Sequence, residues 1–417
     1  MTKKTRLIIM LVCVACFFII APFLVLYSIG DRFDFQKIKI TKTGGIYVRT
    51  FPAAEKIIID SKIIEKPGMF SNSIFVQSLL PDLHTVLAEK SGYYNYFKTI
   101  PVAEEQVTKL ENVLLFKKNI QFEVAPEITQ SPFNTLQKYI IKNNKLYYSN
   151  APENISISAA QKAAPILEDL SAFSVVSNSI IWLGTDGFLY QSGLTNITTT
   201  TKIKPTKLTL TPLKINKKDS YKIVSGSQNI FLIDNNNLLF LNTKTNNLDN
   251  FYNPVENAKI SPDGNNIIYY NDNNIYISPI SAPSTAPNLL YKSPAYAEAS
   301  AGKSEKITDC LWLNNNYIIF VTGPASPSQG GYKIIISETD YRGEINSITF
   351  PSTITIPLSK KIEAPSPTPN AIKTQQPSEA LSAIVNFKNP QIFFNQQDGK
   401  LYILTNGTLL LSEKLIP

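Results

Sequence analysis

The amino-acid sequence opens on one long apolar run and then changes to short segments in which apolar and polar residues alternate. The run extends over residues 7–29, from Leu7 to Ile29, without a charged residue. Its length matches the roughly 20 residues that cross a bilayer as a helix. Pro22 lies inside the run, and one proline is tolerated in a lipid-spanning helix. We therefore predict a transmembrane helix over residues 7–29, through which the chain contacts the membrane.

Charges beside this helix predict its orientation. Lys3, Lys4 and Arg6 precede the apolar run, whereas Asp31 and Asp34 lie among the residues after it. Positively charged flanks favour the cytoplasm, so we expect residues 1–6 to be a cytoplasmic tail and the bulk of the chain to be extracytoplasmic. This is the topology of a single-pass protein of the cell membrane. A cleaved signal peptide is the alternative, although its apolar core usually has only about 7–15 residues; the sequence leaves open whether the helix is retained.

Residues 36–118 show the period-two alternation of half-buried strands. The pattern recurs in six short segments bounded by glycine, proline or aspartate, at residues 37–40, 45–48, 56–60, 73–76, 84–88 and 113–116. Alternating segments separated by such turn residues are typical of antiparallel sheets. We predict a small antiparallel β-sandwich of about six strands.

The turn in the middle of this region carries a family resemblance. Residues 79–86 read LLPDLHTV, and Gly92-Tyr93 follows shortly after. This pattern resembles the Leu-x-Pro-Gly-x-His-x-Val turn and Gly-Tyr pair of the PEGA domain of prokaryotic surface proteins. Asp82 stands where the family has glycine, and aspartate also suits a tight turn. The resemblance implies an extracytoplasmic β-sandwich module, and it brings no catalytic chemistry with it.

A hairpin of two apolar strands recurs six times in residues 119–417. The copies lie at residues 138–148, 179–190, 229–241, 266–277, 317–335 and 391–403. Turn residues that accept positive φ, such as Asp186-Gly187 and Asp398-Gly399, separate the paired strands. The first four copies are spaced about 36 to 50 residues apart, near the 40–50 residues of a propeller blade. Residues 281–306 and 359–380 are low-complexity insertions rich in Pro, Ala and Ser, which we expect to behave as flexible loops.

These repeats predict a β-propeller of about six blades, because closing short sheets into a ring protects their edges. Residues 261–264 read SPDG and resemble the strand-turn-strand of TolB-like and WD-type propellers. We further expect residues 120–124 and 409–411 to close the ring in one shared blade. The predicted fold is therefore mainly β: an N-terminal transmembrane helix, a small antiparallel β-sandwich at residues 36–118, and a propeller at residues 119–417.

Composition and charge exclude several classes of function. Of the formal net charge of +8, three positive charges lie at Lys3, Lys4 and Arg6, and no cluster of cations interleaved with aromatics follows, so we expect no nucleic-acid partner. Cys310, the only cysteine outside the apolar run, is interpreted as a small buried residue. His84 is the only histidine, and one histidine without a ligand cluster supports neither a metal site nor a catalytic triad.

The sequence therefore predicts no catalytic, cofactor-binding or metal residues, no cofactor, and no enzyme activity. Its leading functional hypothesis is a membrane-anchored binding or scaffold protein of the cell envelope, with the propeller face presented to a protein, a peptide or a wall polysaccharide. The alternative is a propeller-borne hydrolase, or a component that processes or senses envelope glycans. The alternative would require carboxylates that converge from different blades.

Overall fold

The computed structural model describes most of the chain and divides it into two compact units. The described residues are 3–28, 30–34, 38–68, 71–125, 139–148, 165–176, 178–193, 205–216, 218–281, 286–294, 305–324, 331–351, 353–357 and 382–416. The first unit comprises Met1–Asn119 with Asp340–Asn346 and Ile416–Pro417, and the second comprises Ile120–Thr339 and Ser347–Leu415. The fold is mainly β, with one apolar helix near the N-terminus. The predicted insertion at residues 359–380 and the position of Ile29 lie outside the described residues.

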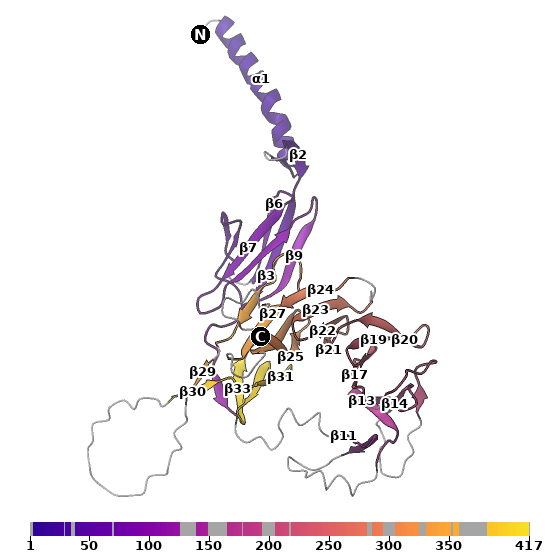
Figure 1. Cartoon of the computed structure of the whole chain (residues 1–417). Helices are drawn as coiled ribbons and strands as arrows, with labels where there is room; N and C mark the ends of the chain where they lie inside the picture. The colour runs from indigo at the N-terminus through magenta and orange to yellow at the C-terminus, as the bar shows by residue number, and fades with distance from the viewer. Residues whose placement is uncertain are drawn as a thin grey trace, which may run out of the picture. The chain divides into compact units, whose positions relative to one another are not determined.

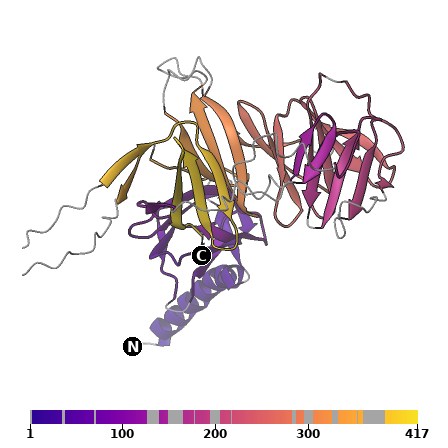
Figure 2. The same cartoon turned by 90° about the horizontal axis from the view of Figure 1, so that it is seen from below.

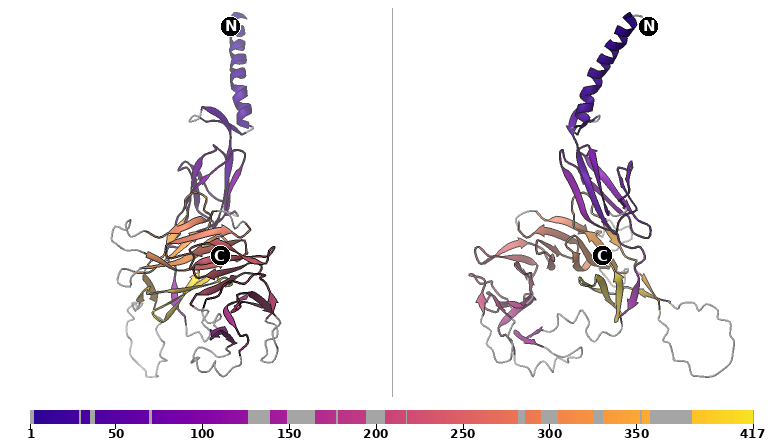
Figure 3. Two further views of the ribbon diagram at one scale, coloured as in Figure 1. Left: turned by 45° about the vertical axis from the view of Figure 1, so that its right-hand side comes forward. Right: turned by 180° about the vertical axis from the view of Figure 1, so that it is seen from behind.

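Helix α1 (Lys3–Ser28) opens the first unit and leads into the two-stranded sheet of β1 (Asp31–Asp34) and β2 (Lys39–Lys42) (Figure 3). Large apolar side chains of α1 are exposed, among them Phe18 with 71% of its surface accessible. The helix is long and apolar enough to cross a membrane, a property that signal sequences near the N-terminus share. At its end, the guanidinium of Arg32 lies 3.5 Å from the ring centre of Tyr27.

The remainder of Met1–Asn119 contains a sandwich of two sheets (Figure 1). One sheet has the order β6-β3-β9 and the other the order β5-β4-β7-β8. Their bounds are β3 (Gly44–Phe51), β4 (Lys56–Ile59), β5 (Ile63–Glu65), β6 (Ser73–Leu79), β7 (Leu83–Glu89), β8 (Tyr96–Pro101) and β9 (Val107–Leu114). The alternating burial of β7 and β8 is that of strands with one face on a core.

The predicted sandwich is therefore present, but it is not wholly antiparallel. Strands β3 and β9 run parallel, with Gly45 opposite Val107. The prediction was wrong for this pair because alternation reports which face is buried and carries no strand direction. Pro81 and Asp82 lie in the turn between β6 and β7, where Asp82 Oδ1 accepts a hydrogen bond from the amide of Leu83 at 2.8 Å.

Four-stranded antiparallel sheets build the second unit. Four of them in the described residues consist of consecutive strands, with the orders β13-β14-β15-β16, β17-β18-β19-β20, β21-β22-β23-β24 and β25-β26-β27-β28. Their bounds are β13 (Leu170–Val176), β14 (Ser179–Gly184), β15 (Leu189–Gly193), β16 (Thr206–Lys207), β17 (Tyr221–Ser225), β18 (Ile230–Asp234), β19 (Asn237–Asn242), β20 (Asn247–Tyr252), β21 (Asn257–Ile260), β22 (Asn266–Tyr270), β23 (Asn274–Pro279), β24 (Asn288–Lys292), β25 (Glu305–Asn314), β26 (Tyr317–Pro324), β27 (Lys333–Glu338) and β28 (Ser347–Thr349). Each sheet is a meander that its own local turns can form.

A fifth four-stranded sheet joins distant parts of the sequence, in the order β10-β33-β32-β31. Its strands are β10 (Phe122–Val124), β31 (Gln391–Asn395), β32 (Lys400–Thr405) and β33 (Thr408–Lys414). Two-stranded sheets are formed by β11 (Tyr139–Lys142) with β12 (Lys145–Tyr148), and by β29 (Thr353–Pro357) with β30 (Ser382–Asn386). The expected pairing of residues 120–124 with residues 409–411 is confirmed, since Glu123 lies opposite Leu411.

Successive sheets pack in the manner of propeller blades. The first strands of consecutive sheets contact one another, from β13 to β17, β21, β25 and then β31. In Figure 2 the yellow strands of the β10-β33-β32-β31 sheet lie beside the orange strands of the β25-β26-β27-β28 sheet. Apolar side chains fill the space between neighbouring sheets; one such layer contains Phe231 and Tyr269, which are almost completely buried. Contacts between first strands and apolar layers between sheet faces are the packing of a β-propeller-like fold.

The recurring hairpin does not occupy the same place in every sheet. The first four-stranded sheets use their recurring hairpin as second and third strands, such as β14 and β15, whereas the last hairpin supplies β31 and β32, the latter joined to β33. The segment 281–306 was expected to be a flexible loop, yet it contains the strand β24. Its residues Leu289 to Tyr291 pair with β23, because a short apolar stretch between prolines is sufficient to complete a sheet.

Candidate functional site

A group of polar side chains gathers where the first strands of three neighbouring sheets meet. It consists of Lys222 on β17, Asn257 and Lys259 on β21, Tyr270 on β22, and Asp309 on β25. We call this set the inner-strand cluster. In a propeller-like fold the first strands surround the axis, so the fold brings side chains from different sheets to one place.

Hydrogen bonds connect the members of the inner-strand cluster in sequence. The ammonium of Lys222 donates to Asn257 Oδ1 at 2.8 Å, and Asn257 Nδ2 donates to the hydroxyl oxygen of Tyr270 at 3.0 Å. Tyr270 lies near enough to Asp309 for the charge of that carboxylate to act on its hydroxyl group, and Asp309 Oδ1 accepts the Cys310 amide at 2.8 Å. The side chain of Asn257 is therefore held from two sides, and its orientation is determined by the cluster.

The charges of the cluster influence one another. Burial, and then the neighbouring charge of Lys259, lower the pKa of Lys222. Burial raises the pKa of Asp309, against the opposing effect of the Lys259 charge. Tyr270 is buried, and burial followed by the nearby Asp309 raises its pKa. Two cations and one carboxylate thus share a partly desolvated space in which each charge acts on the others more strongly than in water.

The backbone around the cluster is held by buried residues. Trp312 donates its indole N–H to the carbonyl oxygen of Lys259 at 2.9 Å, which ties β25 to β21. Cys310 is completely buried, and burial raises the pKa of its thiol well above the ordinary value. A buried thiol of raised pKa is a poor nucleophile, in agreement with the structural interpretation of Cys310.

Sequence reasoning missed the inner-strand cluster. The recurring pattern that could be recognised is the hairpin of second and third strands, whereas Lys222, Lys259 and Asp309 lie on first strands. Neither lysine is part of a recognisable motif. The signal that could have found them is a charged residue inside an otherwise apolar strand, as in the sequence YKIVS of β17.

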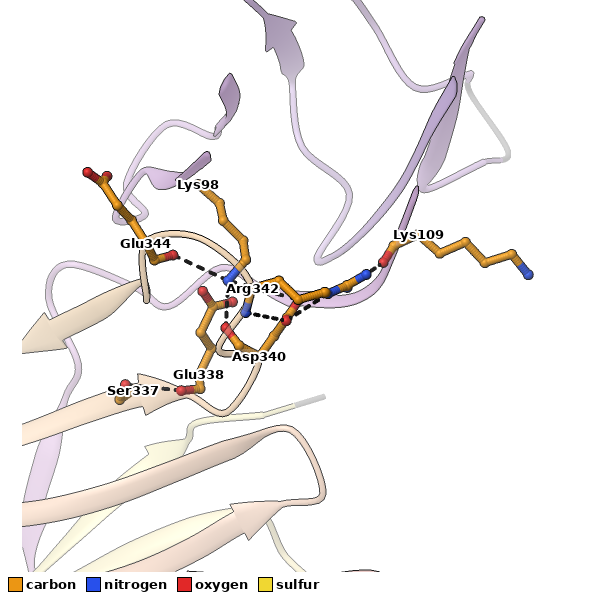
Figure 4. A network of polar contacts seen from close by, with 7 residues as sticks. All are labelled: Lys98, Lys109, Ser337, Glu338, Asp340, Arg342 and Glu344. Carbon is orange, nitrogen blue, oxygen red and sulfur yellow. Dashed lines mark hydrogen bonds and ion pairs between the residues drawn. The ribbon is translucent and has the colours of Figure 1, made fainter. Parts of the chain in front are cut away.

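A second polar network lies in the first unit and includes the segment Asp340–Asn346, which follows β27 in the sequence (Figure 4). The Lys98 side chain has no accessible surface; its ammonium donates to the carbonyl oxygens of Asp340 at 2.7 Å and Glu344 at 3.3 Å. Arg342 binds both carboxylate oxygens of Asp340, at 2.9 and 2.8 Å, and the carbonyl oxygen of Lys109 at 3.0 Å. We call this set the Lys98 network.

The Lys98 network fits a structural role. Burial alone would raise the pKa of Asp340, but the hydrogen bonds from Arg342 and the charge of Lys98 outweigh it and lower that pKa. Lys98 donates to the backbone carbonyl oxygens of Asp340 and Glu344, and Arg342 joins the Asp340 carboxylate to the carbonyl oxygen of Lys109, so the network holds a chain segment in place. The sequence-based prediction had included residues 340–346 in the second domain; the structure groups them with the first unit.

His84 lies on β7 with both ring nitrogens engaged. Nδ1 is 2.6 Å from Asp60 Oδ2, and Nε2 is 2.7 Å from the carbonyl oxygen of Leu80. Asp60 Oδ1 accepts the amide of Thr85 at 2.9 Å. The histidine thus joins two turns of the sandwich. Among the described residues, no group of three or more histidine, cysteine, aspartate or glutamate side chains is arranged to hold a metal ion.

Comparisons with known proteins find likeness among solved structures only. No family model matches it, and no curated protein matches it. The N-terminal domain of Nup159 is a similar solved structure at 12% sequence identity, with a TM-score of 0.33 over 72% of this chain and 96% of that one. Another is the extracellular domain of BT4673 from B. thetaiotaomicron, at 11% identity and a TM-score of 0.35, over 80% of this chain and 37% of that one.

Proposed function

We propose that the chain is a membrane-anchored, extracytoplasmic binding or scaffold protein of the cell envelope. In this proposal α1 is the membrane span, the sandwich is a PEGA-like spacer, and the second unit presents the binding surface. The second unit would be a TolB-like or WD-type propeller of six blades, with the β11–β12 sheet as the core of one blade beside the five four-stranded sheets.

The observation that carries this proposal is the exposure of α1. Its large apolar side chains are exposed, for example Ile8 at 60% and Leu24 at 63%, and the apolar stretch of the helix is not buried against the described part of the chain. Exposed apolar surface of this extent is unfavourable in water by about 25 cal/mol per Å². A lipid bilayer removes that cost, and the three cations before Leu7 favour a cytoplasmic N-terminus.

The inner-strand cluster supports binding more than catalysis. It offers ammonium and amide donors on a fixed backbone, together with the single carboxylate of Asp309. Hydrolysis of a glycan generally requires a pair of carboxyl groups on the two sides of the scissile bond. Recognition requires only fixed donors and acceptors, and the cluster has these.

Site-directed labelling in intact cells tests the proposed topology. One variant carries Lys4→Cys, before the apolar run, and another carries Lys244→Cys, in the exposed turn between β19 and β20. A membrane-impermeant maleimide should label the second variant and not the first until the cells are opened. Both variants are made in a chain whose native Cys13, Cys16 and Cys310 are replaced by alanine, and that cysteine-free chain is the control.

The alternatives give different results. A retained anchor keeps the full-length chain in the membrane after carbonate washing, whereas a cleaved signal sequence releases a shorter chain that lacks α1. Labelling of Lys4→Cys in intact cells, or a chain that stays in the cytoplasm, would contradict the proposal.

A further inference from the structure

Two lysines of the inner-strand cluster are brought together without an ion pair, because Lys222 binds Asn257, and Lys259 follows Asn257 by two positions on the same strand and so lies on the same face of β21. Elsewhere in the second unit, Lys145 is paired with Glu168 at 2.6 Å, and Lys306 and Lys333 are paired with Asp272 and Glu305. Among the described residues, neither Lys222 nor Lys259 forms such a pair. The ammonium of Lys222 donates to the neutral amide oxygen of Asn257. The cluster therefore holds two positive charges that its own side chains do not fully compensate.

This arrangement costs stability. Like charges in a partly desolvated space repel one another. Burial first, and then the charge of Lys259, act against the protonated form of Lys222, whereas the charge of Asp309 favours it. Asp309 offsets part of the repulsion, but its own burial opposes the carboxylate form. Lys222 nevertheless keeps contact with solvent, so a molecule arriving from solution can reach it. A negatively charged ligand would relieve the repulsion.

We propose that the inner-strand cluster binds an oxyanion, carboxylate or phosphate, carried by a hydroxyl-bearing ligand such as an acidic sugar. The inference rests on the proposed function, because it names the class of ligand that the second unit would recognise. The ammonium groups of Lys222 and Lys259 would contact the oxyanion through charge-assisted hydrogen bonds. Asp309 would accept hydrogen bonds from ligand hydroxyl groups, which distinguishes an acidic sugar from a simple inorganic anion.

Titration calorimetry on the full chain in detergent micelles tests the inference. The probes are glucuronate, glucose 6-phosphate and glucose, which share a hydroxyl-bearing ring and differ in the oxyanion. We expect at least one of the two anionic sugars to bind, with glucose bound at least about tenfold more weakly, since one charge-assisted contact is enough for that ratio. The anionic sugar that binds with the higher affinity shows whether the site prefers a carboxylate or a phosphate. Binding should weaken as salt concentration rises.

Lysine substitutions locate the site. Lys222→Met and Lys259→Met should each weaken binding of the anionic sugar by about tenfold, whereas Lys244→Met, an exposed lysine on a turn, should leave it unchanged. Without ligand, Lys259→Met should melt at the same temperature as the unsubstituted chain or higher, because it removes a repulsive charge, whereas Lys222→Met also loses the hydrogen bond to Asn257. A clear fall in the melting temperature of Lys259→Met would instead make this lysine structural and would overturn the inference.

Other outcomes also decide the question. Equal binding of glucose and the anionic sugars, binding that survives both lysine substitutions, or no binding of either anionic sugar would each overturn the proposed ligand class. The labelling experiment on Lys4→Cys and Lys244→Cys is independent of these results. A chain with the expected topology that binds no anion would retain the anchored scaffold function and lose only this inference.

Discussion

Two lysines of this chain show how the surroundings of a charge indicate its role. Lys98 is completely buried, and its ammonium is surrounded by carbonyl oxygens and the carboxylate of Asp340. A buried charge of this kind persists only when its hydrogen-bonding capacity is satisfied, so Lys98 contributes to structure. Lys222 is only partly desolvated and keeps contact with solvent, and its hydrogen-bond acceptor is a neutral amide. The group that Lys222 contacts therefore does not compensate its charge.

Asp340 leads to a pH-dependent prediction. The hydrogen bonds from Arg342 and the charge of Lys98 overcome the effect of burial and lower its pKa in the folded chain. A carboxyl group with a depressed folded pKa contributes stability above its unfolded pKa of about 3.9 and loses that contribution as the pH falls through the folded value. Asp340→Asn should therefore reduce the free energy of unfolding by about 1–3 kcal/mol at pH 7. The difference in the free energy of unfolding between the unsubstituted chain and Asp340→Asn should shrink as the pH falls below about 4.

Glu344→Gln is the matched control for Asp340→Asn. Glu344 contacts Lys98 through its backbone carbonyl oxygen, and its side chain points away from the network (Figure 4). Denaturant unfolding of both variants at pH 7 and at pH 3 makes the comparison. A deficit for Asp340→Asn that is the same at both pH values would show that the carboxylate does not stabilise the segment through its charge.

The segment Asp340–Asn346 carries Asp340 and Glu344, and its backbone conformation depends on one glycine. Gly343 has a φ of +67°, and a Cβ atom placed there would lie 1.7 Å from the carbonyl oxygen of Thr99 on β8. Gly343→Ala should therefore cost the roughly 1–2 kcal/mol of the left-handed conformation and also displace the segment from β8. We expect faster amide hydrogen exchange in residues 340–346 and a lower free energy of unfolding.

Gly407→Ala separates the two effects of this substitution. Gly407 has a similar φ of +73° with no atom within 4 Å of the added Cβ, so it carries the conformational cost without the steric one. If Gly343→Ala and Gly407→Ala destabilise the chain equally, the close approach of the segment to Thr99 does not contribute.

Elements with local signals could be predicted from the sequence, and those without such signals could not. The hairpin β22–β23 is apolar and has its turn residues beside it, so a short window of sequence is sufficient. Strand β8 could not be recognised from the sequence, because Lys98 interrupts the apolar residues on its buried face. The residues that bind the charge of Lys98 lie more than two hundred positions away in the sequence. The inner-strand cluster was missed for the same reason, since its members meet only after three sheets have packed.

At the scale of the whole molecule, pairing between strands that are distant in the sequence affects the order in which the sheets of the second unit fold. Strand β10 completes a sheet whose other three strands lie near the C-terminus, and the amide of Ala125 donates to the carbonyl oxygen of Leu409 at 2.9 Å. Folding of this sheet therefore requires closure of a loop of nearly the whole unit, which is slow relative to the local hairpins. The sheets between β13 and β28 can form before this closure.

A disulfide across this junction tests the pairing directly. Glu123 and Leu411 are opposite each other in the sheet, and opposed residues of antiparallel strands lie about 4.5–5.5 Å apart at Cα, within the range that a disulfide bridges. Glu123→Cys with Leu411→Cys, in a chain whose three native cysteines are replaced by alanine, should cross-link under mild oxidation. The linked peptides are identified by mass spectrometry without reduction. Because the bond closes a long loop, it should raise the free energy of unfolding by up to about 5 kcal/mol.

The control moves one cysteine by a single residue. Ser412 pairs with Phe122, so its side chain points to the opposite face of the sheet from that of Leu411. Glu123→Cys with Ser412→Cys should therefore cross-link poorly, although Ser412 is the residue directly after Leu411. Equal yields from both pairs would mean that β10 and β33 meet without a defined register. A high yield only from Glu123→Cys with Leu411→Cys requires the register of the structure, and with it a second unit whose first and last strands belong to one sheet.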